Sequence, residues 1–150
     1  MITVVIDTNV FISALMKADS APRQVLRMCL QQEVIPLMGT ALFHEYEEVM
    51  SRQHLFTSCT LSESERKELL SDFISVCHWM SVYYLWRPNL PDESDNHLVE
   101  LAMAGNASHI ITGNTKDLVG GELLFPSFSV HTPRQFLNHF EEKHYGNAYH

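Results

Sequence analysis

Short apolar runs alternate along this chain with longer segments in which apolar residues recur every three or four positions. The first run, residues 3–6, is rich in β-branched side chains and predicts a strand buried on both faces. Pro36 marks the second run as an edge strand or an irregularly paired one. In all, such runs predict strands at residues 3–6, 34–38, 81–85, 108–112 and 128–131.

The periodic segments predict helices, and several of them carry start signals. Ser20 stands just before Pro22, a residue favoured at the beginning of a helix, and Thr40 can cap the helix that follows it. Two helices open with the spacing of a capping box, Ser62 with Glu65 and Thr132 with Gln135. The predicted helices cover residues 10–16, 21–32, 41–53, a segment from 62, residues 98–104 and a segment from 132.

This alternation predicts a single α/β domain with a mostly parallel central sheet and helices on both of its faces. A chain of 150 residues is long enough for one core of ordinary size. We expect the domain to span residues 1–140, and residues 141–150 to form a polar, mobile tail.

Composition places the chain among globular proteins, with 45% hydrophobic and 19% charged residues. No apolar run approaches the roughly 18 residues that a membrane span needs. The three cysteines are an odd number without a CxxC pair, which favours reduced thiols and a cytoplasmic location. The net charge of −8 argues against a broad basic surface for nucleic acid, but not against a nuclease whose carboxylates surround a divalent metal.

The candidate chemistry lies where polar residues follow the predicted strands. Asp7 comes directly after the first strand, and Asn114 and Asp117 come after the fourth. Because the carboxyl ends of parallel strands lie along one edge, these residues share that edge. Asp95, at the start of one helix, and Glu45, on the buried stripe of another, can reach it. Converging carboxylate oxygens favour Mg²⁺ or Mn²⁺.

Each of these residues also has a purely structural interpretation. Asp7 can cap the helix that follows it, and Glu45 can pair with an arginine. Acids near Asp95 can complement the helix dipole. Arg23 and Arg27 share a helix face and serve equally well as solvated surface charge or as phosphate contacts.

Other catalytic classes lack their signatures in this sequence. No HExxH or HxxxH pair, Gly-rich phosphate loop or Gly-x-Ser-x-Gly motif is present. The candidate chemistry is therefore that of carboxylates and a hard cation.

Four motifs together resemble the PIN-domain family, and within it the VapC-like toxins of toxin–antitoxin pairs. They are residues 4–10 around Asp7, Glu45 on its helix, the acidic segment 92–96 before an apolar helix, and residues 110–118 after the fourth strand. The resemblance covers nearly all of the chain, from residue 2 to about 140. It implies a three-layer α/β/α sandwich and a metal-dependent endoribonuclease that uses Mg²⁺ or Mn²⁺.

The resemblance also implies roles for single residues. Asp7, Glu45 and Asp95 match the most typical metal-binding acids, and Asp92 is an additional acid of this branch. The residues matching supporting positions are Thr8, Asn9 and Thr112. One position departs from the family pattern, because Asn114 stands where a fourth acid is usual. An amide oxygen can ligate Mg²⁺ but brings no charge, and Asp117 could compensate.

The implied reaction is hydrolysis of an RNA phosphodiester, with Asp92 or Asp117 orienting or deprotonating the attacking water. The resemblance also implies a cognate antitoxin and a homodimer. The main alternative is a catalytically weak or inactive PIN-like module that binds RNA or a protein partner. A flap-cleaving DNA nuclease would share the acids, but the chain lacks the length for a helical arch.

Overall fold

A computed structural model describes residues 1–82, 96–113 and 128–148, with side chains up to residue 141 and without that of residue 96. Its described strands form a five-stranded parallel sheet in the order β3-β2-β1-β4-β5. The strands are β1 (Thr3–Ile6), β2 (Ile35–Met38), β3 (His78–Trp79), β4 (His109–Ile111) and β5 (Ser129–His131). This confirms the predicted α/β class.

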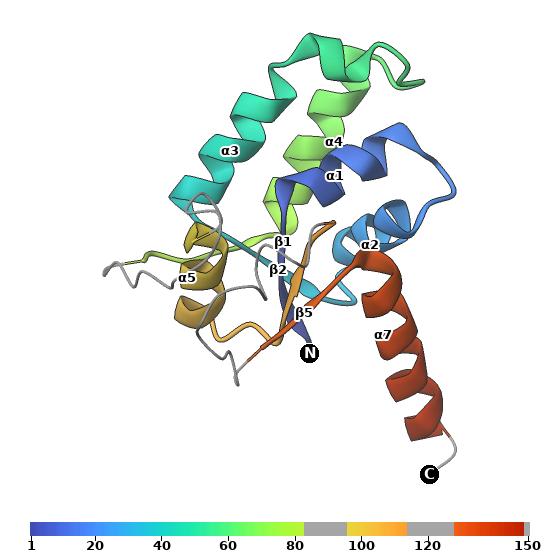
Figure 1. Cartoon of the computed structure of the whole chain (residues 1–150), viewed down its shortest axis with the longest axis vertical. Helices are drawn as coiled ribbons and strands as arrows, with labels where there is room; N and C mark the ends of the chain where they lie inside the picture. The colour runs from blue at the N-terminus through green and yellow to red at the C-terminus, as the bar shows by residue number, and fades with distance from the viewer. Residues whose placement is uncertain (83–95, 114–127, 149–150) are drawn as a thin grey trace.

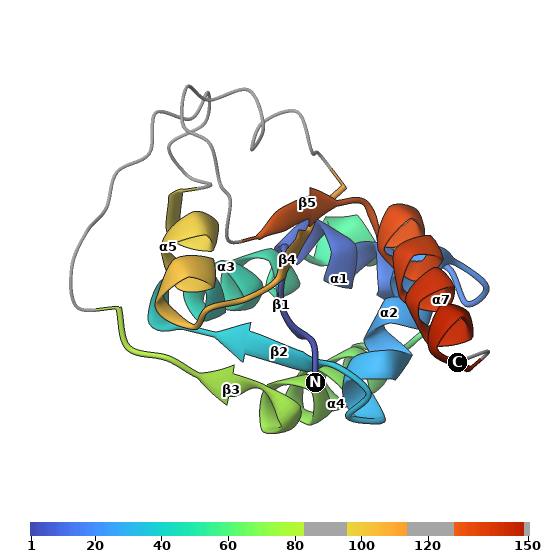
Figure 2. The same ribbon diagram turned by 90° about the horizontal axis from the view of Figure 1, so that it is seen from below.

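Helices cover both faces of this sheet and extend beyond its carboxyl end (Figure 1). Helix α5 packs on one face against β1, β2 and β4, whereas α2, α4 and α7 lie on the other (Figure 2). The helices are α1 (Thr8–Met16), α2 (Ala21–Leu30), α3 (Thr40–Met50), a 3₁₀ turn (Gln53–Phe56), α4 (Glu63–Val76), α5 (Asn96–Ala104) and α7 (Pro133–Ala148). The three layers predicted from the sequence are therefore present.

The central strand β1 holds the core together. Val4 and Val5 are completely buried, because α5 covers one face of the sheet and helices cover the other. Tyr46 of α3 is also fully buried, and its hydroxyl donates to the carbonyl of Ile6 at 2.7 Å. Gly105 ends α5 against β2, where a Cβ would lie only 2.3 Å from Leu37 Cδ1. These contacts fix α3 and α5 relative to the carboxyl end of β1.

The helix starts predicted at Ser20, Ser62 and Thr132 are confirmed. Ser20 accepts from the amide of Arg23, and the capping boxes at Ser62 and Thr132 are both formed. The predicted cap at Thr40 is wrong, because Gly39 occupies the N-cap position and Thr40 is already helical. Extended backbone at Gly39 makes the turn one residue earlier.

The third strand differs from the prediction. Pairing with β2 occurs at His78 and Trp79, directly after the C-cap of α4 at Cys77. Residues 81–82 are not in a strand, and 83–85 lie outside the described residues. Among the described strands, β2 is interior, yet β3 joins it only after Pro36, so β2 has a single neighbour at that proline.

The last helix runs to Ala148, so helical backbone continues past residue 140. The division into a domain of residues 1–140 and a tail remains a prediction. Within the described ranges, no helix has the length and apolar character that crossing a membrane requires.

Candidate functional site

The carboxyl ends of β1 and β4 bring two buried polar residues together. The amide of Asp7 donates to the carbonyl of Ile111 at 2.9 Å, which continues the pairing of the strands by one residue. Thr112 follows Ile111, and its hydroxyl donates to Asp7 Oδ2 at 2.7 Å. Both residues are more than 90% buried. The alternative that Asp7 serves only as a helix cap is not supported, because its carboxylate forms no capping hydrogen bond with the described start of α1.

The electrostatics of Asp7 are unfavourable for a lone carboxylate. Burial raises the pKa of its carboxyl above the ordinary value, and the negative charge of Glu45 raises that pKa further. The Thr112 hydroxyl, the Thr8 amide and the His97 imidazole lower it in part. Two carboxylates that destabilise each other's charge in a buried place favour a cation between them.

Glu45 reaches this edge from α3, on a half-buried side chain that is 33% exposed. The hydroxyl of Thr8 donates to Glu45 Oε1 at 2.8 Å, and His97 Nε2 lies 2.7 Å from Glu45 Oε2. Thr8 directly follows Asp7, so a single residue links the two carboxylates. Both oxygens of Glu45 are thereby oriented from two different helices. An arginine partner, the structural alternative for Glu45, is not what holds it among the described residues.

His97 was missed by the sequence analysis. Its only sequence signal is its place in the first turn of α5, immediately after the acidic segment. An ionised carboxylate only accepts hydrogen bonds, so His97 donates to Glu45 through Nε2. Its role depends on α5 packing beside α3, which the sequence pattern does not reveal.

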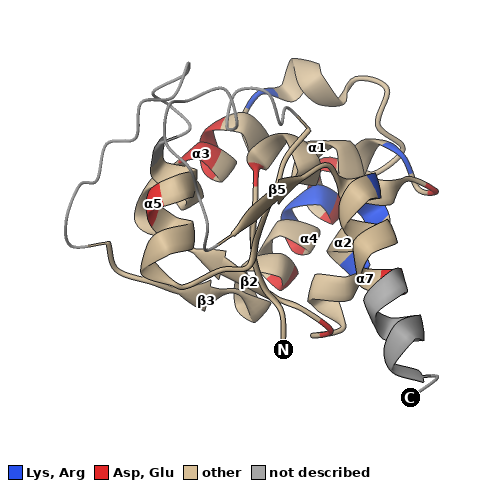
Figure 3. Ribbon diagram, turned by 60° about the horizontal axis from the view of Figure 1, so that its bottom comes forward, with Lys and Arg blue, Asp and Glu red and all other residues tan. Residues whose placement is uncertain are grey.

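Asn9 ties the first turn of α1 to the segment after β4. Its Oδ1 accepts from the amide of Gly113 at 3.1 Å. Acidic positions of α3 and α5 lie around this end of the sheet (Figure 3). Asn9, Thr8 and Thr112 therefore contact the parts of the chain that surround Asp7.

The structure brings together only part of the predicted site. Asp7, Glu45, Thr8 and Thr112 form one connected group. No cluster of three or more His, Cys, Asp or Glu side chains suited to a metal exists within residues 1–82, 96–113 and 128–148. The other predicted site residues, Asp92, Asp95, Asn114 and Asp117, lie outside the described residues.

The donors that are described fit a hard divalent cation. Two carboxylates, Asp7 directly after β1 and Glu45 on α3, offer oxygen ligands and two negative charges. The Thr8 and Thr112 hydroxyls and the His97 ring support them from behind, as outer groups commonly do at metal sites.

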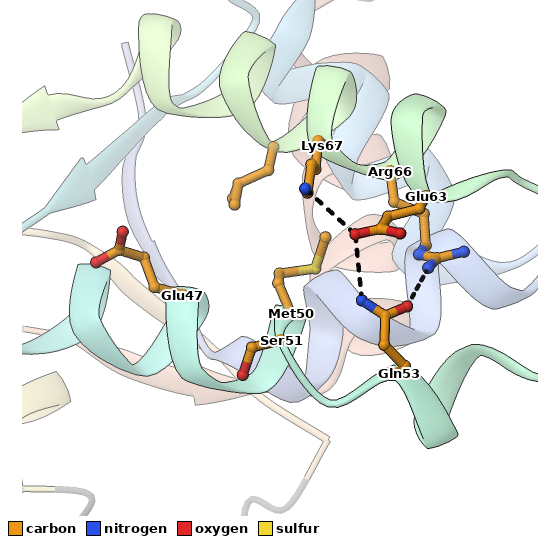
Figure 4. A pocket seen from close by; sticks show the side chains of 8 residues that line it. Glu47, Met50, Ser51, Gln53, Glu63, Arg66 and Lys67 are labelled. Carbon is orange, nitrogen blue, oxygen red and sulfur yellow. Dashed lines mark hydrogen bonds and ion pairs between the residues drawn. The ribbon is translucent and has the colours of Figure 1, made fainter.

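A hollow of about 310 Å³ lies between α3 and α4 (Figure 4), and neither Asp7 nor Glu45 lines it. Its charges already have partners: Lys67 pairs with Glu63 at 3.2 Å, and Gln53 Nε2 donates to Glu63 at 3.3 Å. Arg66 is buried, donates to Gln53 at 3.1 Å and stacks 4.4 Å from the ring of Phe56. This hollow is a structural junction between the two helices.

Arg23 likewise has a structural role. Its guanidinium donates to the carbonyls of Ala14 and Leu15, at the C-terminal end of α1. A cation at this end satisfies carbonyls that the helix leaves without partners. The phosphate-contact interpretation of Arg23 is therefore unnecessary.

Comparison with known proteins agrees with this geometry. The family model of the PIN domain matches residues 3–116. The uncharacterized protein MJ1680 of Methanocaldococcus jannaschii is 28% identical over 155 residues, covering 94% of this chain and 93% of that protein. The crystal structure of VapBC2 from Rickettsia felis, bound to a promoter DNA fragment, is similar with a TM-score of 0.60 and 14% identity, over 87% of this chain and 98% of that one. The chain belongs to the PIN-domain family, whose members are generally nucleases.

Proposed function

We propose that this protein is a metal-dependent endoribonuclease, the toxin component of a type II toxin–antitoxin pair. The observation that carries the proposal is the buried Asp7 carboxylate beside Glu45, joined through Thr8 at the carboxyl edge of a PIN-domain sheet. A purely structural site has no need for two adjacent acids whose charges oppose each other.

Asp7 and Glu45 would hold Mg²⁺ or Mn²⁺, with Asp95 and Asn114 proposed to complete the ligand set. When bound, the cation would polarise the phosphodiester and lower the pKa of a water molecule. Asp92 or Asp117 is proposed to orient or deprotonate that water.

The described residues supply positioning. Thr112 fixes Asp7 Oδ2, while Thr8 and His97 each fix one oxygen of Glu45. Because every one of these contacts comes from a different element or a different turn, small shifts of α3 or α5 would misplace Glu45.

An antitoxin partner is part of the proposal. Its support is the likeness in fold to VapBC2 of Rickettsia felis, which was solved bound to a DNA fragment from its promoter. A homodimer and a cytoplasmic location are further parts of the same proposal.

The test is cleavage of a fluorescent single-stranded RNA with Mg²⁺ or Mn²⁺, beside EDTA. We expect cutting by the wild type and none with EDTA, with Asp7→Asn or with Glu45→Gln. Glu47→Gln is the matched control, since Glu47 lies on the same helix with a side chain that is 54% exposed. Its cleavage rate should equal that of the wild type.

The outcomes separate the two candidate functions. Metal-dependent cutting that persists in folded Asp7→Asn would refute the assignment of the site. A folded wild type that neither cuts RNA nor binds Mn²⁺ by calorimetry would indicate the alternative, a PIN-like binding module. Asn114 and the net charge of −8 favour this alternative.

A further inference from the structure

A cavity of about 400 Å³ lies between the N-terminal end of α3 and helix α5. Its apolar wall comes from Leu42, Met80, Val82 and Leu101. His97 lines the same cavity, so a single imidazole ring separates it from Glu45. The cavity is therefore adjacent to the proposed catalytic site but distinct from it.

Two polar atoms in this cavity wall lack partners among the residues that the structure describes. They are Glu100 Oε1 and His97 Nδ1, both buried. Glu100 is only 8% exposed, so its carboxyl is nine-tenths removed from water. A buried oxygen without a hydrogen bond is costly, which favours a donor from outside the described residues.

The second atom belongs to the ring that holds Glu45. His97 Nε2 lies 2.7 Å from Glu45 Oε2, and Nδ1 of the same ring has no partner among the described residues. Glu100 follows His97 by three residues, so both side chains lie on one face of α5. The cavity thus offers the buried Glu100 carboxyl as its acceptor.

The start of α3 contributes donors to the same cavity. Its first intrahelical hydrogen bond runs from the Phe43 amide to the Gly39 carbonyl at 2.9 Å, and no side chain caps this described end. Thr40, Ala41 and Leu42 line the cavity, and the amides of a first helical turn remain available to an acceptor. Donors and acceptors therefore line one cavity with an apolar wall.

We propose that this cavity binds a nucleobase of the RNA substrate, guanine by preference, and that Glu100 determines this specificity. The inference rests on the proposed ribonuclease function. Guanine presents two adjacent donors, N1–H and the N2 amino group, to the Glu100 carboxylate on α5, and its O6 acceptor faces the amides of α3. Single-stranded RNA is commonly read in this way, by unstacked bases held at their Watson–Crick edge.

Uracil fits this pattern poorly. Its edge carries one N–H between two carbonyl oxygens, so a carboxylate would meet an acceptor. Cytosine and adenine each present one amino donor, so we expect their affinity for the cavity to lie between those of guanine and uracil.

The test is a titration of the ¹⁵N-labelled full-length protein with GMP and, separately, with UMP, in EDTA. Both carry the same phosphate, so a difference reports on the base. We expect GMP to shift the amide resonances of Thr40, Glu100 and Leu101 and to bind on the order of tenfold more tightly than UMP, the size of one good base contact. Glu100→Gln should lose this preference, while Glu47→Gln should keep it.

Three results would overturn the proposal: equal affinity for GMP and UMP, a preference that survives Glu100→Gln, or the same shifts with inorganic phosphate alone. Argininamide bound at these resonances, without any base preference, would also overturn it and assign the cavity to a cationic side chain of a protein partner. If Glu100→Gln does not fold, Ala41→Phe serves instead. Ala41 is exposed and lines the cavity, so a larger side chain there should block GMP and leave Glu100 in place.

This experiment is independent of catalysis. Base-selective binding without RNA cleavage would support the cavity and refute the nuclease. Metal-dependent cleavage without base-selective binding would do the reverse.

Discussion

Asp7 is the residue at which the proposed function and stability conflict. Its folded pKa is raised, so the folded state binds a proton more tightly than the unfolded chain does. Stability is therefore lost as the pH rises from the unfolded value of about 3.8 through the raised folded value, and it stays low at neutral pH. Asp7→Asn removes this charge while its amide oxygen can still accept from Thr112.

We expect Asp7→Asn to raise the free energy of unfolding at pH 7 by about 1 kcal/mol, as removal of a strained functional charge commonly does. Urea denaturation at neutral and mildly acidic pH measures this, and the advantage should shrink as the pH falls. The exposed Asp72→Asn is the control and should change stability by less than about 0.5 kcal/mol. A variant less stable than the wild type at pH 7 would contradict the argument.

Thr8 links the two acids through one hydroxyl. Thr8→Val keeps the shape of the side chain but removes the donor to Glu45 Oε1. We expect Mn²⁺ affinity and cleavage rate to fall by about 10- to 100-fold, the usual effect of losing an outer contact at a metal site. Calorimetry and the RNA assay measure the two quantities.

Thr8→Ser, which restores the hydroxyl, should recover most of the loss. Thr60→Val is the control at an exposed threonine. Unchanged metal affinity in Thr8→Val would mean that the Thr8 contact is structural only.

At this scale the sequence predicts the acids better than their partners. The place of Asp7 at the sheet edge was predicted because it follows a buried strand, and Glu45 was chosen because its spacing put it on the buried stripe of its helix. His97 and Glu100 were not, since their importance arises only where α5 packs beside α3. A hydrogen bond between residues far apart in sequence leaves no local pattern.

Elements were predicted well wherever local chemistry decides their limits. Capping boxes fix the starts of α4 and α7, and buried apolar runs fix β1 and β4. Strand β3 was not predicted, because its two residues are exposed and, among the described residues, pair with β2. Two exposed residues form no apolar run that a sequence pattern could reveal.

Strand β5 and α7 meet at a histidine cluster that makes stability depend on pH. The ring of His131 lies 5.2 Å from that of His109 and 5.6 Å from that of His139. Burial, and then the proximity of His139, lower the pKa of His131 below the ordinary value of 6.5. The unfolded chain therefore takes up a proton that the folded chain does not.

Stability should be lost as the pH falls below about 6.5 towards the lowered folded value. We expect His131→Gln to reduce this pH-dependent loss of unfolding free energy by less than about 1 kcal/mol, because part of the His131 ring still contacts water. Urea denaturation at pH 7.5 and 5.5 measures the difference, with the exposed His78→Gln as control. An unchanged slope in His131→Gln would exclude His131 as its source.

For the whole molecule, strand and helix alternation was sufficient to predict the three-layer fold and its carboxyl edge. The resemblance to PIN domains agrees with the family match over residues 3–116. The full ligand set remains a prediction, because Asp92, Asp95, Asn114 and Asp117 lie outside the described residues.

The net charge of −8 leads us to expect that a bound metal changes the stability of the whole molecule. We expect Mg²⁺ to raise the melting temperature more than NaCl at equal ionic strength, because a ligand that binds the folded state stabilises it by mass action. A concentration of 100 times Kd corresponds to about 2.7 kcal/mol. Differential scanning calorimetry measures the shift.

Glu45→Gln should remove the difference between the two salts, and Glu47→Gln should preserve it. Equal effects of Mg²⁺ and Na⁺ on the wild type would indicate charge screening alone.

The hydrogen bonds that assemble the site join residues 37, 52 and 105 positions apart. During synthesis on the ribosome Asp7 emerges before Thr112, so its carboxylate is not held in place until Thr112 has followed. Because β1 lies at the centre of the sheet and pairs with β4, no shorter nascent fragment contains the complete arrangement. With the proposed function, a nascent chain that stops before Thr112 would be inert towards the messenger that encodes it.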